Sequence, residues 1–112
     1  MYITLPDGKS FAFAGRWEIW NPKDDPENIY KSCAIITIES SESVREIHHC
    51  MPAILKPENY KTWIDPLNLD VNELENILRT GIATELVSHP VSKNVNSVKN
   101  NDPSNIVPLP GF

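Results

Sequence analysis

The sequence predicts an α+β fold with a mainly antiparallel β core and three short helices. Three observations support this expectation. Apolar and polar residues alternate through residues 11–20, as in a strand with one covered face. Residues 33–38 form a continuous apolar run rich in β-branched side chains, which is typical of a buried strand. Residues 39–49, 56–64 and 69–81 have the capping residues and the periodicity of helices.

Residues 1–20 are expected to form strands, with LPDGKS as a turn between two extended pieces. The alternation in FAFAGRWEIW separates two faces of one strand. The face expected to cover the core comprises Phe11, Phe13, Gly15, Trp17 and Ile19. The other face comprises Ala12, Ala14, Arg16, Glu18 and Trp20. Because small residues precede Glu18 on its face, we expect open space beside its carboxylate, as on the floor of a pocket.

The buried strand in the middle of the chain is expected to lead directly into the first helix. Ser40 or Ser41 can cap that helix, and acidic residues in its first turn suit the helix dipole. Spacing of three and four residues gives the helix an inner face, which comprises Val44, Ile47 and His48. His48 is therefore expected at the inner end of a short helix.

The second half of the chain is expected to contain two more helices and a strand. The helix at 56–64 has a proline at an early position that helices tolerate. The last helix is capped by Asp70 and ends at Gly81. Its apolar stripe comprises Val71, Leu74, Ile77 and Leu78. Residues 83–92 are typical of a strand, and the polar tail from residue 93 is expected to follow the surface as extended chain.

Composition and charge narrow the classes of partner and compartment. The 112 residues, enough for one small domain, include 15 acidic and 10 basic side chains, giving a net charge of −5. The chain lacks the excess of basic residues that is typical of nucleic-acid-binding proteins. A net negative charge is nevertheless compatible with a local basic patch. The two cysteines form no CxxC pair, no segment has the pattern of a signal peptide, and no apolar run is long enough to span a bilayer. We therefore expect a cytoplasmic protein with free thiols and no membrane partner.

Metal and thiol chemistry have little support in the sequence. The only set that could bind a metal across the fold is His48, Cys50 and His89, and no pair in it has the spacing of a known zinc site. Cys50 lies two residues from His48, which is a poor geometry for a nucleophile and its base. We expect no metal, no cofactor and two unreactive thiols.

Glu18 and His48 are the strongest candidates for catalysis. Burial of a carboxylate disfavours its charged form, and a nearby imidazole can share or relay the proton. Together the two groups would form an acid/base pair that works near neutral pH. The alternative is a purely structural hydrogen bond between a buried glutamate and a histidine.

Five motifs occur in an order that resembles a known family. They are FAFAGRWEIW, AIITIE, EIHHCMPAIL, WIDP and VSKNVNSVKNNDPSNIVP. In this combination the chain is similar to the SRAP family, the SOS response-associated peptidases or abasic-site-processing proteins. The resemblance covers nearly all of the chain but only the later part of the family's domain. It implies that residues 1–112 are a single partial SRAP-like domain, part of a β-barrel, without the family's N-terminal part.

The resemblance also implies a chemistry. Family members bind single-stranded DNA and form a thiazolidine link with the ring-opened sugar of an abasic site. Their nucleophile is a cysteine that becomes the N-terminal residue after the initiator methionine is removed. In this chain the second residue is Tyr2. We therefore expect an abasic-site-processing DNA-repair protein that is inactive alone and needs the missing N-terminal segment as a partner.

Residue roles follow from the matched motifs. Glu18 matches a glutamate that assists sugar ring opening and proton transfer, and His48 matches a second acid/base group. Thr37 matches a threonine beside the bound DNA, and we expect Arg16 and Trp20, which flank Glu18, to contact the DNA as well. Cys50 stands where the family has an arginine that contacts phosphate, so DNA binding is expected to be weakened or lost.

Two other functions remain open. The chain can be a non-enzymatic interaction module, a remnant of the fold that forms a homodimer to cover exposed strand edges. The lost arginine and the negative net charge favour that alternative. A peptidase that acts through Cys50 is the third possibility.

Overall fold

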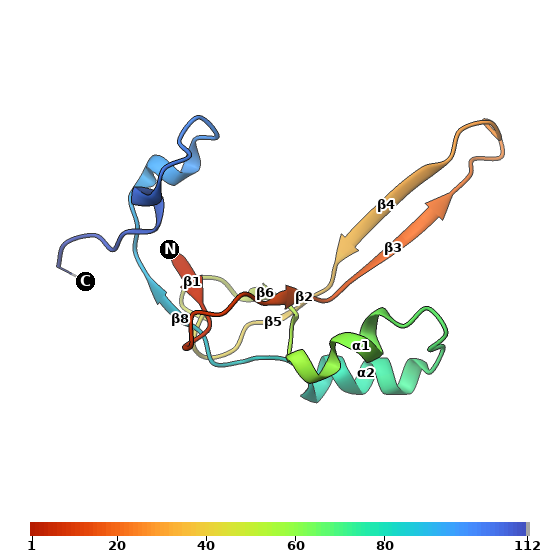
Figure 1. Ribbon diagram of the computed structural model, residues 1–112, viewed down its shortest axis with the longest axis horizontal. Helices are drawn as coiled ribbons and strands as arrows, with labels where there is room; N and C mark the ends of the chain where they lie inside the picture. Colours follow the sequence, from red (N-terminus) through yellow and green to blue (C-terminus); the bar gives the residue numbers. More distant parts are fainter. Residues whose placement is uncertain (112) are drawn as a thin grey trace.

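The structure, a computed structural model, describes residues 1–111 and has a mixed α+β architecture built from four separate two-stranded sheets. All four sheets are antiparallel, and they pair β1 with β8, β2 with β7, β3 with β4, and β5 with β6 (Figure 1). The strands are β1 Tyr2–Thr4, β2 Ala12–Phe13, β3 Gly15–Trp20, β4 Tyr30–Ile35, β5 Thr37–Glu39, β6 Cys50–Pro52, β7 Ile54–Leu55 and β8 Val87–His89. The expected antiparallel α+β class is confirmed, whereas within the described chain the sheets do not close into a barrel.

Three of the sheets meet at one point of the backbone. The N–H of Ala14 donates to the C=O of Ala53 at 2.7 Å, and the N–H of Ile36 donates to the C=O of Ala14 at 2.9 Å. The N–H of Ala53 completes the ring by donating to the C=O of Ile36 at 2.9 Å. Both alanines are fully buried, and a larger side chain would hold the three backbones apart. We call this ring of three hydrogen bonds the backbone junction.

The two helices pack below the junction. They are α1 Tyr60–Ile64 and α2 Val71–Thr80, and short 3₁₀ turns lie at Pro57–Asn59, Lys93–Asn96 and Pro103–Ile106. The indole Nε1 of Trp63 donates to the C=O of Gly15 at 3.1 Å, which attaches α1 to the base of β3. In the described part of the chain, neither helix is long and apolar enough to cross a membrane.

Helix α2 begins and ends where the sequence predicts, and its apolar stripe is largely confirmed. The Asp70 carboxylate accepts a hydrogen bond from the N–H of Glu73 at 3.1 Å. Ile77 is buried in the core, whereas Val71, at the first position of the helix, is exposed. Gly81 ends the helix with a negative φ, so left-handed backbone is not the reason for this glycine. Its carbonyl accepts from the Asn59 amide at 3.1 Å, and that side chain fills the space a Cβ would need.

The expected helix over residues 39–49 is wrong. This segment forms hydrogen-bonded turns, with the N–H groups of Ile47 and His48 both donating to the C=O of Val44. Of the two serines that were expected to cap a helix, Ser41 lies 2.9 Å from the Ser43 hydroxyl, whereas the buried Ser40 hydroxyl has no hydrogen-bond partner within residues 1–111. The Ser43 hydroxyl reaches across to the chain that follows α2. Short polar side chains compete with helix formation in this way, and a helix of so few residues nucleates at a high cost.

The turn at LPDGKS forms as expected. Gly8 adopts a φ of 68°, and its N–H donates to the C=O of Leu5 at 3.0 Å. The Asp7 carboxylate accepts from the N–H of Lys9 at 3.0 Å, and this bond holds the pKa of Asp7 below its usual value.

The hydrophobic core is small and divided. One cluster lies under the junction and against α2, and its buried members are Ala14, Ala53, Leu55 and Ile77. The other lies between β6, β7 and the chain before β8, and its buried members are Val44, Met51, Ile54 and Leu86. The radius of gyration is 17.8 Å, compared with about 13 Å for a compact domain of this length. The chain therefore has more surface than a closed domain of its size.

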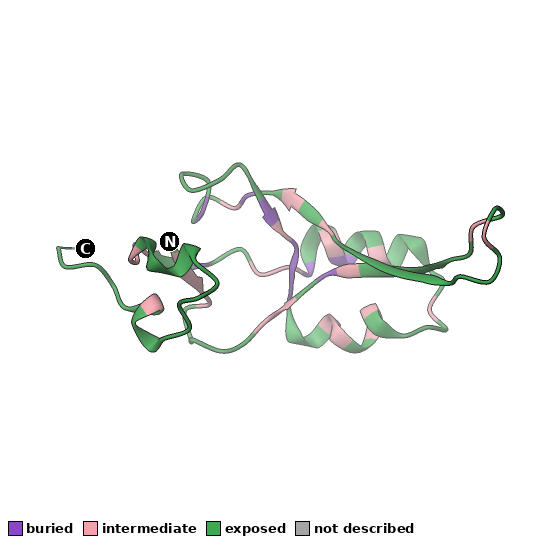
Figure 2. Cartoon of the chain, turned by 90° about the horizontal axis from the view of Figure 1, so that it is seen from above, coloured by how far each residue is buried: buried purple, intermediate pink, exposed green. Residues whose placement is uncertain are grey.

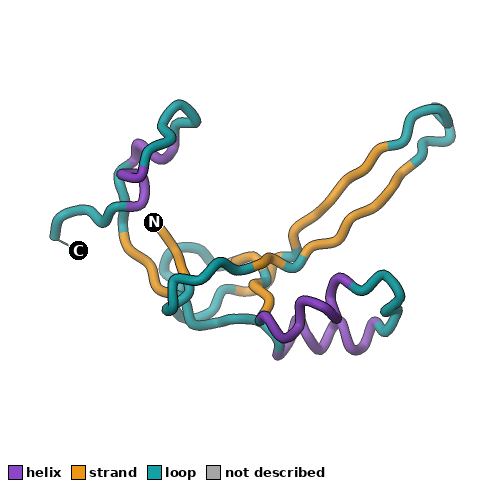
Figure 3. The backbone as a smooth tube through the Cα atoms, viewed as in Figure 1, coloured by secondary structure: helices purple, strands orange, loops and turns teal. Residues whose placement is uncertain are grey.

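The β3–β4 hairpin projects from the body as an arm (Figures 1 and 3). Figure 2 shows that the arm is exposed along its length, while the buried residues gather in the body. The expectation that Trp17 and Ile19 face a core is therefore wrong. The expected buried strand at 33–38 is wrong for residues 33–35, whereas Ile36 and Ile38 pack partly buried against the core. Trp17 is 69% exposed, and every residue of β4 is exposed. Within residues 1–111, β3 and β4 pair only with each other, and α1 contacts the arm only at its base.

The tail also differs from the expected extended chain. Its two 3₁₀ turns pack on each other, and the ring of His89 lies 2.9 Å from the C=O of Ile106 through Nε2. The N–H of Leu109 donates to the C=O of Pro90 at 3.0 Å, so the tail folds back on the end of β8. It forms a small hook on the opposite side of the molecule from the arm (Figure 1).

Candidate functional site

Three of the five candidate residues share one face of the arm. Arg16, Glu18 and Trp20 alternate along β3, and the register pairs them with Ala34, Ser32 and Tyr30 of β4. Directly paired residues lie on the same face of an antiparallel sheet. The alternation in the sequence therefore predicts correctly which side chains stand together. We call this surface, which comprises Arg16, Glu18, Trp20, Tyr30 and Ser32, the site face.

Glu18 lies in the middle of the site face, in open solvent. Its side chain is 67% exposed, and its carboxylate lies 3.8 Å from the Arg16 guanidinium. An exposed pair at this distance contributes little to stability. Within residues 1–111 no second layer covers the site face, so Glu18 does not lie on the floor of an enclosed pocket. A shallow cavity of about 240 Å³ beside Glu18 is open to solvent, and Ser32 and Cys33 line its other side.

Two aromatic rings stand at the outer end of the site face. The rings of Trp20 and Tyr30 have centroids 5.7 Å apart and are tilted by 39°. Exposed aromatic rings are a platform on which unpaired bases can stack. Tyr30 was missed by the sequence analysis, because its position opposite Trp20 depends on the length of the loop that joins the strands.

The other two candidate residues lie on the β5–β6 hairpin. Thr37 is paired with Pro52 at one end of this hairpin, and His48 lies in the turn segment that connects the strands at the other. Both are exposed. His48 is also stacked on His49, with ring centroids 4.6 Å apart.

The backbone of Cys50 fixes the His48 ring. Nδ1 of His48 lies 3.0 Å from both the N–H and the C=O of Cys50. The neutral nitrogen can accept from that N–H, and the protonated nitrogen can donate to that C=O. Either protonation state of Nδ1 is thus accommodated, which leaves Nε2 as the nitrogen available to a substrate. Because Nδ1 contacts the backbone of Cys50, the ring is not oriented by the thiol.

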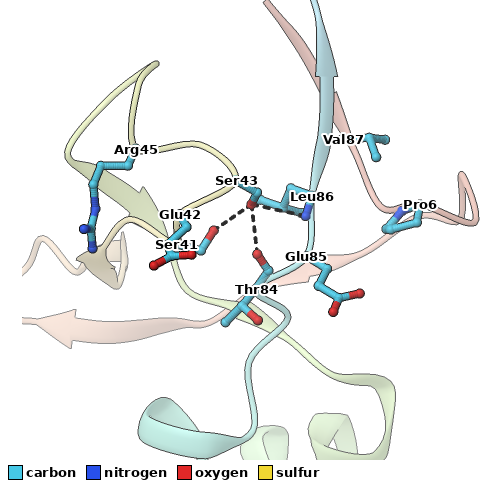
Figure 4. A pocket seen from close by; sticks show the side chains of 9 residues that line it. All are labelled: Pro6, Ser41, Glu42, Ser43, Arg45, Thr84, Glu85, Leu86 and Val87. Atoms are coloured by element: carbon cyan, nitrogen blue, oxygen red, sulfur yellow. Dashed lines mark hydrogen bonds between the residues drawn. The ribbon is translucent and has the colours of Figure 1, made fainter.

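Ser43 joins the segment that leads to His48 to the chain before β8, as Figure 4 shows. The Ser43 hydroxyl donates to the C=O of Thr84 at 2.9 Å and accepts from the N–H of Leu86 at 3.3 Å. It also lies 2.9 Å from the Ser41 hydroxyl. Together these residues line a wide groove of about 730 Å³ between the segment and the chain before β8. Ser43 therefore helps to hold this segment in place together with the buried Val44, although nothing in the sequence pattern distinguishes Ser43 from its neighbouring serines.

The structure does not bring all five candidates together. Among residues 1–111, no hydrogen bond or ion pair joins Glu18 to His48, and the two groups come from different hairpins. Within the same residues, no three His, Cys, Asp or Glu side chains converge as they would around a metal ion. Cys33 and Cys50 are both free and exposed.

Comparison with known proteins places these hairpins in a family. The sequence profile of the SOS response associated peptidase (SRAP) family matches residues 1–98. The chain belongs to the SRAP family.

Several relatives of this chain are named for abasic site processing. Abasic site processing protein YoqW of Bacillus subtilis is 42% identical over 104 residues, which are 92% of this chain and 45% of the relative. YobE of the same organism is 41% identical over 87% of this chain and 43% of its own length. The chicken abasic site processing protein HMCES is 39% identical over 88% of this chain and 29% of its own length. The chain thus spans less than half of the relatives that it matches.

Proposed function

We propose that this chain is one half of an abasic-site-processing domain, which handles the damaged sugar on single-stranded DNA in a cytoplasmic setting. The family match over residues 1–98, together with relatives named for abasic site processing, carries the proposal. The single-domain assignment of residues 1–112, with the rest of the family's domain as its partner, is part of the same proposal. The exposed arm supports it, since a half domain leaves uncovered the surfaces that its other half would bury.

The proposed chemistry assigns each half a separate part. The aldehyde of a ring-opened abasic sugar condenses with the α-amine and the thiol of an N-terminal cysteine, and water leaves as the thiazolidine ring closes. Tyr2 cannot provide the thiol, so the cysteine belongs to the other half. Glu18 moves the proton that opens the sugar ring, and Nε2 of His48 is the second acid/base group. Closure of the domain brings these two side chains to the same sugar.

The site face and Thr37 are proposed to bind the DNA strand. Trp20 can stack on a base, and the guanidinium of Arg16 can contact a phosphate. Cys50 replaces the family's phosphate-binding arginine, so we expect binding by this chain alone to be weak.

A crosslinking assay tests the proposal. The chain is incubated with single-stranded DNA that contains one abasic site, either alone or fused to the part of YoqW that precedes the matched region. We expect no adduct from the chain alone and, from the fusion, a band that survives a denaturing gel. In the fusion, Glu18→Gln is expected to lower the rate of crosslinking, and Glu75→Gln, which changes an exposed carboxylate on α2, is the matched control. An adduct from the chain alone would refute the proposed division of the chemistry, and so would equal rates for the two variants.

The second candidate function is a non-enzymatic interaction module. The observation that favours it is the uncovered apolar surface of the arm, where Trp17, Ile19 and Ile35 are exposed. Exposed apolar groups at an unpaired sheet edge are typical of an association surface. Binding to single-stranded DNA without damage, measured across a salt series, separates the two functions. Phosphate contacts give a steep dependence on salt, whereas a protein-binding module shows no binding at any salt concentration.

A further inference from the structure

The β5–β6 hairpin has one exposed, polar face. Its register pairs Thr37 with Pro52 and Glu39 with Cys50, and directly paired residues lie on the same face of an antiparallel sheet. The pair between them, which includes the buried Met51, lies on the opposite face and packs on the core. Thr37, Glu39 and Cys50 are all exposed. We call the surface formed by these three residues and Pro52 the hairpin face.

A guanidinium is held beside the hairpin face. Nη2 of Arg45 donates to the Glu39 carboxylate at 3.3 Å. Arg45 is the only Lys or Arg in the sequence between residues 37 and 52. Figure 4 shows that its side chain extends away from Ser43 and Thr84, which join this segment to the chain before β8. The positive charge of the segment is therefore presented on the side of the hairpin face.

His48 is connected to the same face by a short series of contacts. Nδ1 of His48 lies 3.0 Å from the backbone of Cys50, Cys50 is paired with Glu39, and Glu39 binds Arg45. Each sugar of a DNA strand is bonded to phosphates. A strand that presents its abasic sugar to Nε2 of His48 therefore also brings phosphates to the surface around that ring.

The pair of Arg45 and Glu39 is better suited to binding a phosphate than to being covered by protein. The two side chains are 58% and 82% exposed. Burying an ion pair removes both charges from water at a high cost, so this surface differs from the apolar residues of the arm, which a second half can cover favourably. An exposed pair contributes little to stability, and a phosphate can take the place of the carboxylate. A guanidinium can hold a phosphate through two parallel hydrogen bonds.

We propose that Arg45 binds a phosphate of the DNA strand beside the sugar at His48, and that Glu39 occupies the guanidinium until the strand displaces it. The inference rests on the proposed function, because it requires an abasic strand at His48. It gives Arg45 and Glu39 opposing effects on the same strand. Removal of the guanidinium should weaken binding, whereas removal of the carboxylate should tighten it.

Binding to DNA without crosslinking tests the inference. The 112-residue chain is titrated with single-stranded DNA that contains tetrahydrofuran, an abasic-site analogue without an aldehyde, and fluorescence anisotropy is measured across a salt series. Arg45→Ala should weaken binding about threefold at low salt and reduce the slope of log K against log salt by about 0.7, the contribution of one phosphate contact on a single strand. Glu39→Gln should tighten binding about twofold, because the guanidinium is then free. Arg79→Ala removes an exposed guanidinium from α2 and is the matched control, which should keep the slope.

A rescue variant separates a phosphate contact from a general loss of positive charge. Residue 50 is paired with Glu39 on the hairpin face, so Cys50→Arg places a new guanidinium on that face. In the Arg45→Ala background, Cys50→Arg should restore the salt slope, and Glu39→Gln should tighten binding by less than it does in the unchanged chain. Equal slopes for Arg45→Ala and Arg79→Ala would overturn the inference and leave the proposed function intact. A lack of salt-dependent binding by the unchanged chain would overturn both.

Discussion

The body and the arm of this molecule are built from similar strands, yet their environments are opposite. Ala14 is fully buried at the junction, and the strand that begins at the next residue leads directly to Trp17, which is 69% exposed. Both regions have the alternation that predicts a strand. The body has helix α2 and a second sheet to cover its apolar side chains, whereas the arm has neither. Periodicity thus predicts the conformation of a strand, and burial depends on what lies against it.

The body and the arm should differ most in the stability that each loses when a large apolar side chain is shortened. Ile77→Ala in the core should lower the free energy of unfolding by about 2–5 kcal/mol, because it leaves a cavity beside the junction. Ile19→Ala on the arm removes the same atoms from a half-exposed site and should cost well under about 1 kcal/mol. Urea unfolding followed by far-UV circular dichroism compares the two. Equal losses would mean that the arm is packed as tightly as the body.

Enlarging a small side chain should also destabilise the body more than the arm, although by less than the removal of Ile77 does. Ala53→Leu inserts three carbons between backbones that are held together by hydrogen bonds, and should cost about 1–3 kcal/mol. Ala34→Leu makes the same change in β4, where the residue is exposed, and should have almost no effect. The midpoints of thermal unfolding give the comparison. A neutral Ala53→Leu would indicate that the junction opens easily.

A third contrast concerns hydroxyl groups. Ser43→Ala leaves the N–H of Leu86 and the C=O of Thr84 without their side-chain partner, which should cost about 1–2 kcal/mol. It should also shift the amide resonances of the segment that includes His48. Ser32→Ala on the site face should change neither property, and two-dimensional NMR of both variants shows the difference. Unchanged resonances in Ser43→Ala would mean that the segment is positioned without this serine.

The smallest expected effect is local and depends on pH. The Asp102 carboxylate accepts from the N–H of Ser104 at 2.8 Å, and this bond holds the pKa of Asp102 below its usual value. Because the pKa of Asp102 is lower in the folded tail than its ordinary value of 3.8, the charged carboxylate stabilises the turn above about pH 3.8. This stabilisation is lost as the pH falls through the lower pKa of the folded state. The amide shift of Ser104 should follow this titration. Asp102→Asn should abolish the titration, and a shift that persists would assign it to another group.

The sequence predicts local features of this chain better than features that join distant segments. Helix α2 is predicted from its cap to its end, because Asp70 and the stripe through Ile77 act within the helix. The site face is predicted from the alternation of Arg16, Glu18 and Trp20, and this needs only one strand. The position of Tyr30 opposite Trp20 depends on how β4 pairs with β3, so the sequence of β3 alone does not predict it.

Two other expectations failed because distant contacts decide them. The turns before His48 replace a helix, since Ser43 bonds to Thr84, which lies beyond α2 in the chain. The burial of Trp17 would need a covering layer, and residues 1–111 place none over it. The proposed meeting of Glu18 and His48 joins two different hairpins, and no pattern within either motif determines it.

The backbone junction has a consequence for how the protein opens. Each of its three residues both donates and accepts, so separating any two strands also weakens the bonds of the third. The amide protons of Ala14, Ile36 and Ala53 should therefore exchange with deuterium at one common slow rate, set by cooperative unfolding of the whole body. Amides in the middle of β3, such as that of Glu18, should exchange much faster through fraying of the arm alone.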